Sequence, residues 1–90
     1  MTTKQLSTWL KNECQNSEPK IPDALMPACI ECEETTGYVM DALSHANMIQ
    51  KQHDELCGLM PQKIEYLGRD MNETIYRIAQ DLQEKLEIIP

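Results

Sequence analysis

The chain has 90 residues and a formal net charge of −7, with 15 acidic residues against 8 Lys and Arg. A surface of this sign repels phosphate backbones and anionic lipids, so we expect neither direct nucleic-acid binding nor a membrane partner. No apolar run reaches the roughly 20 residues of a membrane span, and no apolar signal segment follows Met1, so we expect a cytoplasmic protein.

Residues 3–16 are predicted to form a short helix. Thr2 and Gln5 have the spacing of a capping box. Leu6, Trp9, Leu10 and Cys14 then lie on one side. Pro19 disfavours helical geometry at the residue before it, so we expect the helix to end ahead of that proline.

Residues 23–57 are predicted to form one long helix. Its apolar residues recur every seven positions, as in the row Leu25, Cys32, Val39 and Ala46. We expect Pro27 either to lie near the start of this helix or to bend it. Gly58 fits the left-handed position that follows many helices, and Pro61 prevents continuation.

Residues 61–87 are predicted to form the last helix, with Pro61 in its first turn. Apolar residues again step by three or four positions, and Glu73 with Arg77 has the spacing of an ion pair. A connection of about three residues makes the second and third helices antiparallel neighbours. The expected fold is therefore all-α: one domain in which a short N-terminal helix packs on one end of a long two-helix hairpin.

Two helices cannot bury apolar stripes of this width, and the first helix reaches only one end of the hairpin. We therefore expect a homo-oligomer, in which a second copy completes a helical bundle. The predicted oligomer seam consists of Val39, Leu43, Ala46, Ile49, Leu56, Ile64, Leu67 and Met71.

The cysteines admit several interpretations. Cys29 with Cys32, and His53 with Cys57, have spacings that zinc sites use, but one continuous helix would hold the two pairs about 40 Å apart. We favour cysteines packed as small apolar residues, with no metal. In an oxidising setting, Cys14 could form a disulfide with Cys29 or Cys32.

We predict no enzymatic activity and no cofactor. The sequence contains no Ser/His/Asp or Cys/His constellation, and its three glycines form no phosphate-binding loop.

The charge pattern suggests a function. Residues 21–50 contain no Lys or Arg but five acids, among them Glu31, Glu34 and Asp41. A solvated helix face explains such a pattern in ordinary terms. Our main hypothesis is a protein-protein interaction module, an adaptor or inhibitor of the counter-defence type that viruses and mobile elements encode. Its protein partner would present a basic surface to those three carboxylates.

Two other hypotheses stay open. Aromatic residues (Trp9, Tyr38, Tyr66, Tyr76) could stack on bases while Arg69, Arg77 or Lys20 pairs with phosphates at a subunit junction. In this alternative, an oligomer sequesters a nucleotide-like anion, with Trp9, Tyr66, Arg69 and Arg77 as its ligand-binding residues. The aromatics can equally fill the bundle. The third hypothesis is a structural bundle subunit.

Overall fold

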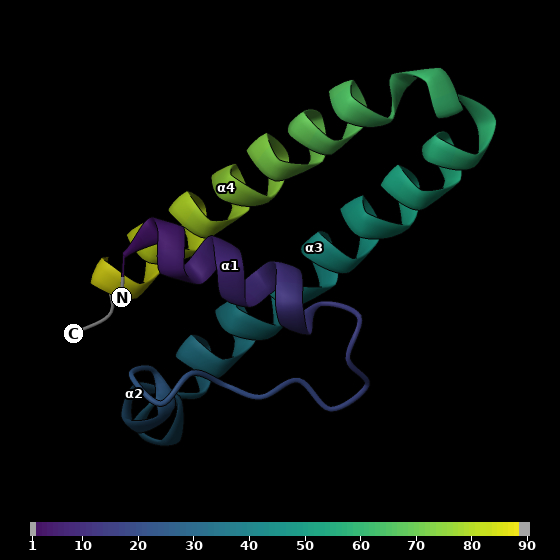
Figure 1. The fold of residues 1–90 in the computed structure, drawn as a ribbon. Helices are drawn as coiled ribbons and strands as arrows, with labels where there is room; N and C mark the ends of the chain where they lie inside the picture. Colours follow the sequence, from purple (N-terminus) through teal and green to yellow (C-terminus); the bar gives the residue numbers. More distant parts are fainter. Residues whose placement is uncertain (1, 89–90) are drawn as a thin grey trace.

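The computed structural model describes residues 2–88, which are all-α (Figure 1). The elements, in order, are α1 (Thr3–Glu13), α2 (Met26–Glu31), α3 (Glu33–Leu59), the 3₁₀ turn η1 (Pro61–Lys63) and α4 (Ile64–Ile88). Helices α3 and α4 form the expected antiparallel hairpin, and α1 packs across its end away from the turn. None of these helices is long and apolar enough to cross a membrane.

Helix α1 begins with the predicted capping box. The hydroxyl of Thr2 accepts from the Gln5 N–H at 3.2 Å, and the Gln5 side chain accepts from the Thr2 N–H at 2.9 Å. The helix ends at Glu13, three residues earlier than predicted. The Glu13 carboxylate accepts hydrogen bonds from the Asn16 side chain and the Lys20 N–H, and these bonds turn the chain into the linker.

The prediction of one continuous helix over 23–57 is wrong. Pro27 lies in the first turn of α2 and does no harm there, but the backbone is extended at Cys32 (φ −139°, ψ 115°). In a continuous helix the Cys29 carbonyl would accept from the Glu33 N–H. Here it accepts from the Thr36 hydroxyl at 3.0 Å, so a side chain replaces the helical bond and the helix breaks.

The turn between α3 and α4 also differs from the prediction. Gly58 has no positive φ; it lies inside α3, which ends at Leu59. The Met60 N–H donates to the Leu56 carbonyl at 2.8 Å, and Pro61 then begins η1. Pro61 therefore stops α3 as expected, but it opens a 3₁₀ turn, and α4 itself starts at Ile64.

The core lies where all three main helices meet, at the α1 end of the hairpin. Its fully buried side chains include Leu6 and Leu10 of α1, Val39 and Ala46 of α3, and Ile75, Ala79 and Leu82 of α4. Burying one Leu or Ile side chain stabilises the fold by about 1.5–3 kcal/mol. Helix α1 thus supplies apolar surface that the hairpin lacks.

This core corrects the predicted oligomer seam. Val39, Leu43 and Ala46 of α3 are already buried within one chain, in the core cluster that they form with residues of α1 and α4, and Leu67 of α4 is buried as well. Ile49 and Met71 are half-buried. Four exposed apolar residues of the hairpin lie near its turn, and we call them the turn-end surface: Leu56, Leu59, Ile64 and Tyr66. Met40, Met48 and Tyr76 are also exposed but lie farther along α3 and α4. Self-association stays a prediction, now confined to this surface.

The helical placement of Gly58 can be tested by its replacement. A Cβ added at Gly58 or at Gly37 meets no atom within 4 Å, and both residues are helical. We therefore expect Gly58→Ala to raise the free energy of unfolding by about 0.5–1 kcal/mol in urea denaturation, and Gly37→Ala to do the same. A decrease for Gly58→Ala alone would indicate a left-handed backbone there instead.

Candidate functional site

The break between α2 and α3 forms a hollow edged by two carboxylates. Glu31 is the last residue of α2, and Glu34 lies in the first turn of α3. Both are exposed and line a space of about 560 Å³ together with Leu25, Ala28, Cys32, Thr35 and Leu86. We call this space the acidic hollow. Two of the three predicted partner-binding residues therefore share one site.

The acidic hollow depends on local features of the chain. Leu25 is buried, and its N–H donates to the Pro22 carbonyl at 2.9 Å, which turns the linker into α2. Thr35 is 1% exposed and anchors the start of α3 in the core. Glu33 and Glu34 lie in the first turn of α3, beside its free N–H groups, where negative charge is favourable. The contacts of Leu25 and Thr35 thus fix the backbone positions of Glu31 and Glu34 at the edge of the acidic hollow.

Cys32 has a distinctive chemical environment at the centre of the break. The Thr35 backbone N–H, followed by the Thr35 hydroxyl and the Glu34 N–H, lowers the pKa of the Cys32 thiol. Burial has the opposite effect on Cys14, whose pKa it raises. The two thiols therefore differ in reactivity, because the thiolate is the nucleophile.

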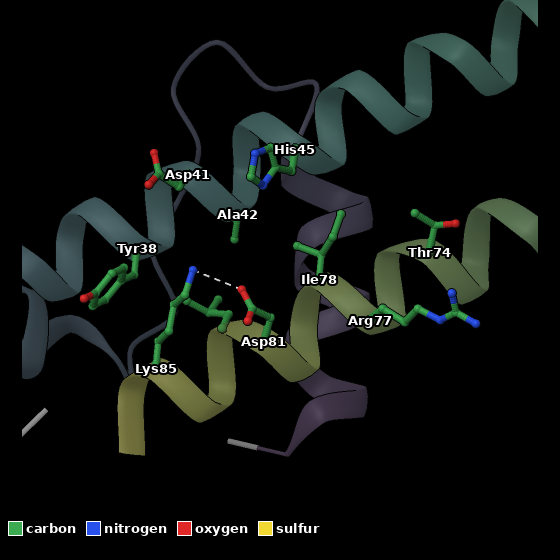
Figure 2. A pocket seen from close by; sticks show the side chains of 10 residues that line it. Tyr38, Asp41, Ala42, His45, Thr74, Arg77, Ile78, Asp81 and Lys85 are labelled. Carbon is green, nitrogen blue, oxygen red and sulfur yellow. Dashed lines mark ion pairs between the residues drawn. The ribbon is translucent and has the colours of Figure 1, made fainter. Parts of the chain in front are cut away.

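Asp41, the third predicted partner-binding residue, lies in a different pocket. This space of about 270 Å³ lies between α3 and α4 (Figure 2). The Lys85 ammonium lies 3.0 Å from the Asp81 carboxylate and 5.3 Å from the centre of the Tyr38 ring. Asp81, and more weakly Asp41, raises the pKa of Lys85. The positive charge of Lys85 already lies in this pocket and partly neutralises its carboxylates. Asp41 therefore contributes little to a binding site for a basic partner.

The structure does not bring the predicted ligand-binding residues together. The Trp9 indole N–H donates to the Lys20 carbonyl at 2.6 Å, in the linker. Tyr66 is 62% exposed at the turn end of α4. Arg69 is exposed on α4, two helical turns before Arg77. One chain therefore does not form a nucleotide site from all four residues, and the predicted site at a subunit junction stays a prediction.

Arg77 has a different setting from the one predicted. The expected Glu73–Arg77 ion pair is absent, since the one ion pair among residues 2–88 joins Asp81 and Lys85. Arg77 points away from that pair (Figure 2) and also lines a groove between α4 and α1. An exposed Glu–Arg pair contributes little to stability, so its absence here costs the fold little.

That groove contains cations that sequence reasoning missed. Lys4 and Lys11 of α1 line it, seven residues apart on one side of their helix. The seven-residue spacing of the two lysines can be read from the sequence. It indicates a site only because α1 packs beside Tyr76 and Arg77 of α4.

The remaining titratable groups form no larger cluster. The Cys57 sulfur lies 3.5 Å from His53 Nε2, one helical turn away. Within residues 2–88, no group of three or more His, Cys, Asp or Glu side chains is arranged to hold a metal ion. All four cysteines are free thiols, so neither disulfide weighed for Cys14 is present.

The contrast between the cysteines predicts an order of alkylation. In reduced protein carrying Cys29→Ser, which removes the neighbouring thiol, we expect iodoacetamide to modify Cys32 well before Cys14. The pH at which the Cys32 rate is half-maximal should fall below that of a cysteine peptide, because its pKa is lowered. Peptide mass spectrometry measures both rates, and faster reaction of Cys14 would contradict the assignment.

Three comparisons with known proteins found no match to this chain. No protein-family model matches the chain. No curated protein matches it at significance. No solved structure matches it either. The function is therefore inferred from geometry and charge alone.

Proposed function

We propose that this protein is a protein-protein interaction module that binds a basic segment of a larger protein at the acidic hollow, as an adaptor or inhibitor. The observation that supports this most directly is the shared placement of Glu31 and Glu34. The two exposed carboxylates edge one hollow, and Leu25 and Leu86 line it.

The chemistry of the acidic hollow suits an Arg or Lys side chain. Such residues combine an apolar stem with a charged head, so the stem can contact leucine while the head pairs with carboxylate. An Arg head can also form two parallel hydrogen bonds to one carboxylate, which gives geometric specificity. The hollow is open enough, at about 560 Å³, for a long side chain and part of its backbone.

The wider charge distribution favours the same class of partner. No Lys or Arg occurs from residue 21 to residue 50, which covers the linker end, α2 and more than half of α3. Glu31, Glu33 and Glu34 stand within four positions of one another there. A concentrated field of one sign attracts oppositely charged surfaces and speeds their association.

The turn-end surface supports a second element of the proposal, self-association. Leu59 is 77% exposed and Ile64 is 52% exposed, with Tyr66 beside them in sequence. Contiguous exposed apolar residues commonly mark an interface. A dimer joined there would leave the acidic hollow free, because the hollow lies at the opposite end of α3.

The first test replaces carboxylates without changing side-chain size. We expect Glu31→Gln/Glu34→Gln to weaken capture of a basic protein partner from cells by about tenfold, since both carboxylates are exposed and an exposed charge pair contributes roughly 0.2–1 kcal/mol. The matched control is Asp54→Asn/Glu55→Gln, which removes the same charge from exposed positions nearer the turn. Quantitative mass spectrometry of captured proteins provides the measurement, and equal capture by the two variants would refute the proposed site.

The second test concerns self-association. We expect light scattering of reduced protein to give the mass of a dimer, and Leu59→Asp to give a monomer because it places a charge in the interface. Ile30→Asp is the control, since Ile30 is 80% exposed but lies on α2 at the far end. A monomeric wild-type protein, or equal effects of the two substitutions, would show that the turn-end surface does not join copies.

A further inference from the structure

We infer that the groove between α1 and α4 binds a nucleoside phosphate. We call it the basic groove; Lys4, Thr8 and Lys11 line it from α1, and Glu73, Tyr76 and Arg77 line it from α4. Its volume of about 590 Å³ falls within the range of small-molecule sites. This inference goes beyond the proposed function and involves none of the residues of the acidic hollow.

The cations of the basic groove are available to a ligand. Lys4, Lys11 and Arg77 are three of the eight Lys and Arg residues in the chain, and within residues 2–88 only Lys85 among those eight pairs with a carboxylate. Acidic residues outnumber basic ones almost twofold, so three unpaired cations around one groove run against the composition. Phosphate oxygens are the natural acceptors for such a set, since Arg binds them in a forked geometry and Lys as a point charge.

The basic groove also offers a partner for a base and for a sugar. The Tyr76 side chain is 42% exposed beside Arg77, so its ring can stack on a base. Among residues 2–88, Glu73 is the one carboxylate on the groove wall, one helical turn before Arg77. A carboxylate repels phosphate but accepts hydrogen bonds from ribose hydroxyls. Together these groups match a nucleotide better than a bare anion.

Size and net charge favour a single nucleotide over a nucleic acid. Helix α1 spans only about 16 Å, so the basic groove is short. The chain as a whole carries a net charge of −7, which would repel the phosphates of a long strand. A compact anion contacts the three cations and avoids the acidic remainder.

The experiment measures ATP binding to the full chain by isothermal titration calorimetry in about 50 mM salt, where charge interactions are weakly screened. We expect one site per chain. Lys4→Gln/Lys11→Gln should weaken binding about tenfold, because it removes two phosphate partners. Lys51→Gln/Lys63→Gln, which changes the charge equally at exposed positions outside the basic groove, should leave affinity within about twofold. Circular dichroism checks that each variant is folded.

Aromatic variants separate base stacking from charge. Tyr76→Ala should weaken ATP about tenfold but leave inorganic triphosphate unchanged, because only ATP has a base to stack. Met48→Ala, which shortens an exposed side chain of α3 outside the basic groove, should change neither. The inference is overturned by an absence of ATP binding at millimolar concentration, by equal losses in the two lysine pairs, or by tighter binding of a single-stranded oligonucleotide than of ATP.

Discussion

The packing of α1 on the hairpin is the interaction on which the rest of the structure depends. Leu6 and Leu10 are almost fully buried and join Ile75, Ala79 and Leu82 of α4 in one cluster. The chain has no Phe and a single Trp, so aliphatic side chains must form the core. In a chain of this size a large share of the surface stays exposed, and every buried leucine matters. Without α1, one end of the hairpin would present its apolar stripe to water.

The same packing creates the basic groove between α1 and α4. Helix α1 presents its leucines to the core, and its lysines at positions 4 and 11 then lie along the edge that faces α4. Arg77 and Tyr76 approach that edge from the other side. A cationic site in an acidic chain therefore follows from how one short helix is oriented, because no single segment contains all of its residues.

The second candidate site results from an interrupted helix. The extended backbone at Cys32 separates α2 from α3, and the Thr36 hydroxyl occupies the carbonyl that a continuous helix would use. Because of this break, Glu31 and Glu34 belong to two helices and can edge one hollow from both sides. The acidic hollow lies at the break between α2 and α3 and reaches Leu86 of α4, whereas the basic groove lies between α1 and an earlier part of α4, and the two carry opposite charge. One chain can thus offer separate sites to a basic protein segment and to a small anion.

Periodicity determined most of the fold. The recurrence of apolar residues predicted helices over most of α1, α3 and α4 and apolar sides that contain Leu6 and Val39, because helical spacing is a local property of the sequence. The short connection before Pro61 predicted the antiparallel order of the last two helices. The capping box at Thr2 was predicted for the same reason. The sequence did not predict the break at Cys32 or the helical conformation of Gly58. Each depends on a hydrogen bond or backbone angle that tertiary packing selects among several local choices.

Glu31 and Glu34 were identified from their charge, but only the tertiary structure placed them in one hollow, separated Asp41 from them, and brought Lys4 and Lys11 to Arg77. Residues far apart in the chain meet only where the core requires their helices to cross.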